Sequence, residues 1–202
     1  MEAFTKLTAV AAPLDMANID TDKIIPGRFL RKLRGPGYDK LAFHDIRFHA
    51  DGSENPDFVL NKAPYRAAKI LVAATNFGCG SSREAAVYVM FDFGIRAVIA
   101  PSFGDIHYGN ELQNGMLPVV LPDAVCASLR AQLHASPGAT ISIDLDAQHV
   151  TAPDGARHAF EIDANAKERL LKGLDDIGLV MQYSNEIEAF EQRHRQAMPW
   201  LA

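Results

Sequence analysis

The chain has 202 residues and a mass of 22.1 kDa, with 48% apolar and 22% charged residues. This is the composition of an ordinary globular protein, and the length suits one large domain or two small ones. A formal charge of −5 argues against broad nucleic-acid binding, and two cysteines cannot by themselves hold a disulfide framework, a zinc ion or an iron–sulfur cluster.

Membrane insertion and secretion are not expected from the sequence. The longest apolar stretch, residues 85–103, is interrupted by Asp92 and Arg96, so it is too broken to span a bilayer. The first residues, 1–14, lack the basic start and long apolar run of a secretory signal. We therefore expect a cytoplasmic protein with reduced thiols and with neither a membrane nor a nucleic-acid partner.

The first third of the chain combines one apolar run with long polar segments. The run 7–14 predicts a strand, and residues 24–26 predict a second short strand or turn after a polar loop. The basic segment 28–38 is interpreted as a short helix broken into a loop, and 44–61 shows no clear element. Because long segments without structure of their own are usually functional, we expect a mobile loop over about 28–61.

A strand–loop–helix–strand unit follows this region. Residues 69–75 predict a buried parallel strand, 76–82 a glycine-rich turn, and 83–93 a helix that ends at Gly94 before a strand over 97–100. The unit has the length of a right-handed crossover connection. The turn is therefore expected at the C-terminal end of the 69–75 strand, where open α/β sheets bind their ligands.

The rest of the chain alternates helices and strands and ends in an amphipathic helix. We expect a helix over 104–114, a strand over 116–121 and a helix that is capped by Asp123 and runs to about His134. A meander is expected over 140–146, 148–152 and 157–162, with a turn at 153–155. After it we expect a helix over 164–172 closed by Gly173, an apolar return over 174–182 and a helix over about 185–196. No internal repeat or low-complexity segment interrupts this order, so residues 1–202 are expected to form a single α/β domain.

The clearest chemical signal is segment 76–84, Asn-Phe-Gly-Cys-Gly-Ser-Ser-Arg-Glu. Its glycines allow the backbone to approach a ligand closely, while Ser81 and Ser82 offer hydroxyls and N–H groups at a helix N-terminus. Arg83 adds a planar fork for a carboxylate or phosphate. The segment therefore predicts an anion pocket that contains a hydroxyl.

The segment does not match other known ligand-binding loops. Arginine at the third glycine position excludes a dinucleotide fingerprint, and neither a P-loop lysine nor a Gly-x-Ser-x-Gly elbow is present. A simpler alternative is that Ser81 only caps the helix while Arg83 pairs with a neighbouring acid. A further alternative is a non-catalytic module that uses the same loop to bind a carboxylate or phosphate.

Five blocks, in order along nearly the whole chain, resemble one family. The first, third and fourth resemble motifs of the aconitase superfamily's swivelling domain, and the second and fifth are similar to the small subunits of 3-isopropylmalate dehydratases. The resemblance implies a swivelling β/β/α domain of the aconitase type. The blocks are Asn18-Ile-Asp-Thr-Asp-Lys-Ile-Ile-Pro26, Asn55-Pro-Asp-Phe-Val-Leu-Asn61, segment 76–84, Pro101-Ser-Phe-Gly-Asp-Ile-His-Tyr-Gly-Asn110 followed by Gly115-Met-Leu-Pro118, and Gly173-Leu-Asp-Asp-Ile-Gly178.

The resemblance also implies an activity. It is that of a hydro-lyase small subunit in leucine biosynthesis, which interconverts 2-isopropylmalate and 3-isopropylmalate by dehydration and rehydration. A [4Fe–4S] cluster that acts as a Lewis acid is expected on a partner large subunit, with no metal bound by this chain. Ser81 is implied as the base that removes the proton beside a carboxylate of the dicarboxylic hydroxy acid, with Ser82 and Arg83 holding substrate oxygens. A serine base needs a strongly positive pocket, because a hydroxyl is far more basic than a group poised near neutral pH.

Further substrate-binding residues are implied near the opening motif. Asp22 matches an acidic residue of the family, and Arg34, twelve residues later, lies where aconitases place a substrate-binding arginine. Arg31 is a second candidate, and Arg28 and Lys32 are within reach of the same role. The alternative for this basic run is a solvated face.

Two departures from the family pattern leave the substrate open. Ala85 follows Glu84 where the family commonly has histidine, and Arg31 lies where an apolar residue is typical of an isopropyl substrate. Homoaconitate and alkylmaleate therefore remain alternatives to isopropylmalate. His107 is interpreted as a packed helix residue rather than a donor to Ser81, and Cys79 as a small packing residue rather than a nucleophile.

Overall fold

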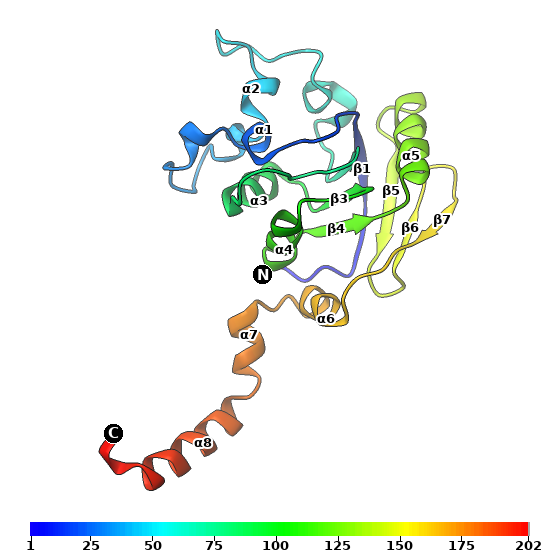
Figure 1. Cartoon of the computed structure of the whole chain (residues 1–202). Helices are drawn as coiled ribbons and strands as arrows, with labels where there is room; N and C mark the ends of the chain where they lie inside the picture. The colour runs from blue at the N-terminus through cyan, green and yellow to red at the C-terminus, as the bar shows by residue number, and fades with distance from the viewer. Residues whose placement is uncertain (202) are drawn as a thin grey trace.

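A computed structural model describes residues 1–201, which fold around one seven-stranded mixed sheet (Figure 1). The strand order is β4-β3-β2-β1-β5-β6-β7; the first four strands run parallel and the last three are antiparallel. The strands are β1 (Lys6–Leu14), β2 (Ile70–Ala73), β3 (Ala97–Ala100), β4 (Leu117–Val120), β5 (Thr140–Asp144), β6 (His149–Thr151) and β7 (Arg157–Ala159).

Strand β1 joins the two halves of this sheet. Its first half, Lys6–Val10, pairs with β5 in antiparallel register, and its second half, Ala11–Leu14, pairs with β2 in parallel register. One nine-residue strand can serve both partners because it is long enough to pair with each over four or five residues. The parallel strands and the meander are therefore parts of one curled sheet.

Two apolar cores lie on the two faces of the parallel strands. In β2, Leu71 and Ala73 face a core shared with helix α3 (Glu84–Phe93) and the segment between β1 and β2. Ile70 and Val72 face a second core with helix α5 (Asp123–Ala135) and the antiparallel strands. Because both faces are buried, the strand has the continuous apolar sequence from which it was predicted.

The mixed α/β architecture and most elements after residue 68 agree with the predictions from sequence. The remaining helices are α1 (Thr21–Ile24), α2 (His44–Arg47), α4 (Asp105–Gln113), α6 (Ala164–Lys172), α7 (Asp176–Met181) and α8 (Ser184–Ala197). Gly94 and Gly173 end α3 and α6 in the left-handed conformation, with φ of +111° and +67°. Their place after a helix is the expected signal for a helix end.

Three segments differ from the predictions. Residues 24–26, predicted as a short strand or turn, form no strand: Ile24 is the last residue of helix α1, because the Asp20 side chain accepts a hydrogen bond from the Lys23 N–H at 2.7 Å and begins a helical turn. Residue Asp123 is the first residue of α5, and Pro122 is its N-cap. The segment 174–182 contains helix α7, which Asp175 caps by accepting from the Gly178 N–H at 2.7 Å.

The segment predicted as a loop over 28–61 carries short elements and contributes to the core. It forms α2 and several 3-10 turns, and Tyr38, Phe43 and Leu60 are buried against the α3 side of the sheet. Its polar residues lie between these anchors. The segment is therefore attached to the body at several points, and its mobility stays a prediction.

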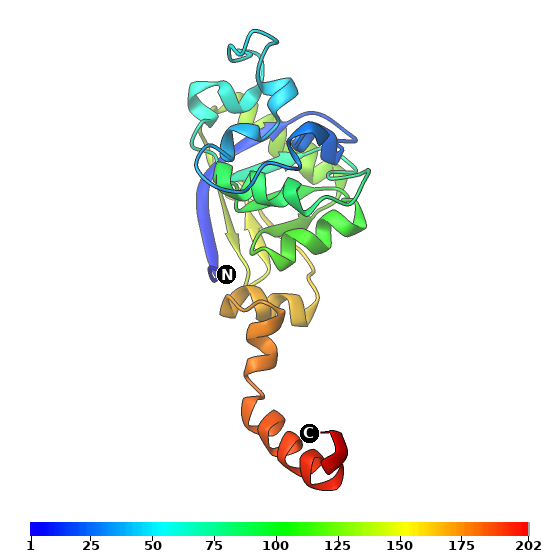
Figure 2. The ribbon, with the colours of Figure 1, turned by 90° about the vertical axis from the view of Figure 1, so that its left-hand side faces the viewer.

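Helices α7 and α8 leave the body after α6 and project away from it (Figures 1 and 2). The side chains of both helices are exposed or partly exposed. Within residues 1–201, no helix is long and apolar enough to cross a bilayer.

Candidate active site

The glycine-rich loop after β2, residues 76–82, is held from both sides at the C-terminal edge of the parallel strands. On one side, the Gly78 N–H donates to the Ile19 carbonyl at 2.7 Å. On the other side, the Phe77 N–H donates to the Ser102 carbonyl at 3.0 Å, and the Gly104 N–H donates to the Phe77 carbonyl at 2.8 Å. The loop therefore lies between the segments that follow β1 and β3, which confirms its predicted place at the end of the strand.

Close packing against helix α4 requires glycine at two positions. Gly78 has a φ of +71°, and a Cβ added to it would lie 2.1 Å from Cδ2 of His107. A Cβ on Gly104 would lie 2.6 Å from the carbonyl oxygen of Gly78. Side chains at these positions would separate the loop from α4, so the glycines set the position of the serines that follow.

A hollow of about 180 Å³ lies between this loop and the start of α4. Ser81, Ser82 and Arg83 line it together with Thr21 and His107, and both serines are exposed. Thr21 holds the loop, since its Oγ1 donates to the Ser81 carbonyl at 2.8 Å and its N–H donates to the Cys79 carbonyl at 3.0 Å. The structure thus brings the predicted hydroxyls and guanidinium into one cavity, with Thr21 as a contributor that the sequence did not single out.

Arg83 and Asp22 form an ion pair beside this cavity. The Asp22 carboxylate also accepts from the Gly27 N–H at 3.2 Å. The hydrogen bond from Arg83 holds the pKa of Asp22 below its usual value, with a further contribution from the charge of Arg83. Asp22 therefore orients the Arg83 side chain, which is 17% exposed and so sits largely inside the structure.

The two serines precede the helix rather than cap it. Helix α3 begins at Glu84, Arg83 is the N-cap residue, and no side chain caps this end among the described residues. The alternative in which Ser81 only caps the helix therefore does not describe the structure. That alternative also predicted an acid partner for Arg83, and Asp22 is this partner. The unpaired N–H groups of a helix start and the guanidinium both make this end positive.

The basic run is not gathered at the serine loop. Arg34 makes a bidentate pair with Asp92, Nη2 to Oδ1 at 2.6 Å and Nε to Oδ2 at 2.9 Å, and lies over the Tyr88 ring at 4.9 Å. Asp92 is eight residues beyond Glu84 on α3, about 12 Å along the helix. Arg28 pairs with Asp45, and Arg31 is exposed. The structure thus joins Asp22 to the site and leaves Arg34 and Arg31 outside it.

A buried acid, which was not among the predicted site residues, lies behind the loop. Glu111 is fully buried on α4, one turn after His107, and its Oε1 lies 3.0 Å from His107 Nε2. Burial raises the pKa of Glu111, while the histidine partner opposes this shift. The His107 ring also packs edge-on against Phe77 at 5.5 Å. The prediction of a packed helix histidine agrees with this placement. Glu111 follows His107 by four positions, a spacing that brings two side chains together on one side of a helix, so the sequence contained a signal for this pair.

The cysteines of this chain do not form a donor set for an iron–sulfur cluster. Cys79 is half-buried in the serine loop, whereas Cys126 is buried in the second core with its Sγ 3.5 Å from the Leu121 carbonyl. Burial raises the pKa of Cys126 to about 11, which opposes the thiolate that a metal requires. Among residues 1–201, no group of three or more His, Cys, Asp or Glu side chains is arranged to hold a metal ion.

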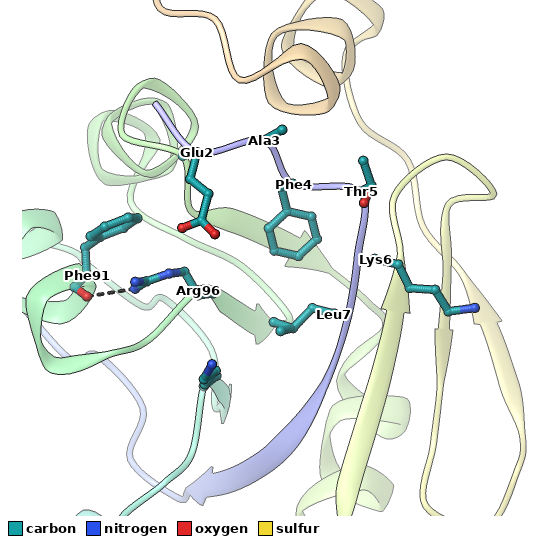
Figure 3. Close-up of a pocket in the computed structure, with 10 residues that line it drawn as sticks. Glu2, Ala3, Phe4, Thr5, Lys6, Leu7, Phe91 and Arg96 are labelled. Atoms are coloured by element: carbon teal, nitrogen blue, oxygen red, sulfur yellow. Dashed lines mark hydrogen bonds between the residues drawn. The ribbon is translucent and has the colours of Figure 1, made fainter.

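A second hollow, of about 190 Å³, lies at the opposite end of the parallel strands around Glu2 and Phe4 (Figure 3). Arg96 reaches into it, lies over the Phe91 ring at 3.7 Å and donates to the Phe91 carbonyl at 2.7 Å. The guanidinium is thus occupied by the protein itself. None of the predicted site residues lines this hollow, so the serine loop remains the candidate active site.

The sheet order and the serine loop at the end of β2 define a swivelling domain of the aconitase type. Comparisons with protein families agree: residues 1–124 match the aconitase C-terminal domain, 127–164 match a family described as LeuD_N, and 176–202 match the C-terminal domain of the 3-isopropylmalate dehydratase small subunit.

Individual relatives match over nearly their whole length. The 3-isopropylmalate dehydratase small subunit of Gluconacetobacter diazotrophicus is 52% identical over 99% of this chain and 97% of its own, and that of Rhodospirillum rubrum is 52% identical over 100% and 97%. The crystal structure of 3-isopropylmalate dehydratase LeuD from Methanocaldococcus jannaschii matches with a TM-score of 0.66 and 25% identity, over 92% of this chain and 99% of that one. The chain belongs to the family of 3-isopropylmalate dehydratase small subunits, so the predicted family and fold are confirmed.

Proposed function

We propose that this chain is the small subunit of a cytoplasmic hydro-lyase that interconverts 2-isopropylmalate and 3-isopropylmalate by dehydration and rehydration, in leucine biosynthesis. Whole-length similarity to small subunits that carry this name supports the assignment. The observation that carries it is the cavity in which Ser81, Ser82 and Arg83 lie together at the C-terminal edge of the parallel strands.

In this proposal Ser81 removes the proton beside a substrate carboxylate, and Ser82 and Arg83 hold substrate oxygens. The exposed hydroxyl of Ser81 is open to a ligand, and the N-terminus of α3 and Arg83 provide a positive environment for its alkoxide form. Asp22 neutralises part of this charge through its pair with Arg83. The remaining positive charge must therefore come from the large subunit, so the chain alone is expected to be inactive.

The proposal places the [4Fe–4S] cluster on a large subunit, since the two cysteines here lie apart and one is buried in the core. When bound there, the cluster supplies a Lewis acid for the departing hydroxyl. This chain contributes the proton-removing hydroxyl and the anion contacts from the other side of the substrate. The two subunits then form the active site between them.

Arg31 and Arg34 are proposed to reach the dicarboxylic substrate only in that complex. For this, Arg34 would have to leave Asp92. A partly exposed ion pair of this kind contributes about 0–1 kcal/mol, so a substrate carboxylate can replace Asp92 with little loss of stability. Homoaconitate and alkylmaleate are the alternative substrates, and the names of the relatives favour isopropylmalate. A non-catalytic binding module would instead bind a carboxylate or phosphate tightly without a partner.

Reconstitution tests this function. The chain is mixed anaerobically with a cluster-loaded large subunit, and the unsaturated intermediate is followed by ultraviolet absorbance with alkylmalate, homocitrate-type and citrate-type acids side by side. We expect turnover of isopropylmalate, and loss of that turnover in Ser81→Ala. Turnover of another acid alone would change the substrate, and no turnover by an intact complex would favour the binding module.

A further inference from the structure

The C-terminal arm, which we define as residues 176–201, presents an unusual amount of apolar surface. It comprises α7, α8 and the final turn Pro199–Leu201, and none of its residues is buried. Six of its large apolar side chains are between 58% and 74% exposed, although such side chains normally lie in a core. These are Ile177, Met181, Tyr183, Phe190, Trp200 and Leu201.

On α8 the apolar residues follow one side of the helix. Ile187 and Phe190 are separated by three positions, Tyr183 lies four before Ile187, and His194 lies four after Phe190 with its ring 5.6 Å away. This spacing is that of a seam which packs against another surface. The opposite side of the helix carries polar residues, including Gln192 and Gln196. A helix with this pattern is stabilised by covering its apolar side, and no part of residues 1–201 buries it.

The arm begins at the N-terminal end of the parallel strands, opposite the end that carries the serine loop. Helix α6, from which it continues, is joined to the start of the chain: the N-terminal amine of Met1 donates to the Gly173 carbonyl at 3.0 Å, and the Phe4 N–H donates to the Leu170 carbonyl at 2.8 Å. Met1 and Phe4 precede β1, whereas the serine loop follows the other ends of the parallel strands. Figures 1 and 2 show the arm extending away from the body, and the exposed fractions of its apolar side chains leave them accessible to a partner.

A second copy of this chain, paired through α8, is a poor occupant for this surface. The 14 residues of α8 span about 21 Å, and one pair of helices of that length buries well under the roughly 800 Å² per partner of a stable interface. Such a pair would also leave Ile177 and Met181 on α7, and Trp200 beyond α8, uncovered. The arm therefore needs a broader surface that follows all three of its elements.

We propose that the arm is the docking element by which this chain binds its large subunit, an inference that rests on the proposed function. The family comparisons give the arm a match of its own: the C-terminal domain described for the small subunit matches residues 176–202, whereas the body is matched by the aconitase C-terminal domain over 1–124 and by LeuD_N over 127–164. The apolar side of the arm predicts an apolar receiving surface. Charge complementarity with α8 predicts basic groups beside Glu186 and Glu188 and acidic groups beside Arg193 and Arg195.

Charge substitutions on the two sides of α8 test this proposal in the full-length chain. The test variant is Ile187→Asp/Phe190→Asp, and the matched control is Gln192→Asp/Gln196→Asp, which adds the same charge to the opposite side. The dissociation constant for the large subunit is measured by light scattering or anisotropy, which do not depend on turnover. We expect the test variant to raise it about thirtyfold or more and the control to change it less than about threefold.

Helix content and turnover show whether the substitutions act on binding alone or on folding and catalysis. All four sites are on the surface, so circular dichroism is expected to show the same helix content in every variant, and a saturating amount of the test variant is expected to restore full turnover because the serine loop is intact. An unchanged dissociation constant overturns the proposal. So does a loss of self-association in the free chain with normal binding to the large subunit, which would assign the surface to a second copy. A wild-type complex that forms but does not turn over isopropylmalate refutes the proposed function and leaves the docking surface standing.

Discussion

The serine loop and the basic segment 28–34 are both predicted to contact substrate, but different forces hold them in place. The loop is fixed by backbone hydrogen bonds to the segments after β1 and β3 and by the contact of Gly78 with His107. In the basic segment Phe29 packs against the core, but the arginine side chains are held by surface ion pairs, Arg28 with Asp45 and Arg34 with Asp92. Backbone hydrogen bonds in a closely packed site hold the loop in one conformation, whereas an arginine in an exposed ion pair can change its carboxylate partner with little loss of free energy. The loop is therefore expected to be preformed, and the arginines to change partners when the large subunit binds.

The largest expected effect is the loss of the Ser81 hydroxyl. Ser81→Ala removes the proposed base, so kcat of the reconstituted enzyme should fall by about 10²–10⁴-fold. Thermal unfolding of the free chain should be unchanged, because the side chain is exposed. Steady-state kinetics with isopropylmalate give the measurement. A kcat within a fewfold of wild type would remove Ser81 from the chemistry.

A methyl group at Gly78 should break the preformed loop. In Gly78→Ala the Cβ meets the His107 ring, and the φ of +71° strains any other residue, so we expect a loss of about 1–3 kcal/mol of stability and most of the activity. Urea unfolding and kcat measure the two effects. Gly109→Ala on α4, where a Cβ meets nothing within 4 Å, is the matched control and should be neutral or slightly stabilising. Full activity of Gly78→Ala would contradict this account of the contact.

Arg34 tests whether the basic segment exchanges partners. Arg34→Ala and Asp92→Asn both remove the same surface pair, which is worth about 0–1 kcal/mol of unfolding free energy, and Arg34→Ala also removes the contact with the Tyr88 ring. Only Arg34→Ala removes a substrate contact in the complex, and we expect it to raise KM about tenfold, the value of one hydrogen bond to a charged group. Equal KM values for the two variants would mean that Arg34 has only its structural role.

The smallest effect concerns the pair between Arg28 and Asp45. The guanidinium holds the pKa of Asp45 at about 2, below its unfolded value, so the stabilisation from this pair is present above the unfolded pKa and is lost as pH falls toward 2. In Arg28→Ala the pKa of Asp45 should return toward the ordinary aspartate value, with little change in stability at neutral pH because both groups are exposed. A carboxyl titration followed by NMR measures this shift, and an unchanged pKa would show that the pair does not persist in solution.

The loop could be predicted from the sequence because its signals are local. A continuous apolar run predicted β2, and glycines beside serines and arginine predicted an anion loop before a helix. The pairing of Arg34 with Asp92 could not be predicted, since the residues are 58 positions apart and many acids are available to a surface arginine. Helix α7 was missed although Asp175 is a suitable cap, because its apolar residues suggested a return to the core that the fold does not make.

Proton exchange at the substrate tests the central claim most directly. The complex with wild-type chain and the complex with Ser81→Ala, brought to equal assembly by light scattering, are incubated with isopropylmalate in deuterium oxide. If Ser81 removes the proton beside the carboxylate, NMR should show deuterium entering that position with the wild-type complex and not with the variant. Deuterium incorporation at the wild-type rate in Ser81→Ala would contradict the account and assign proton removal to another group.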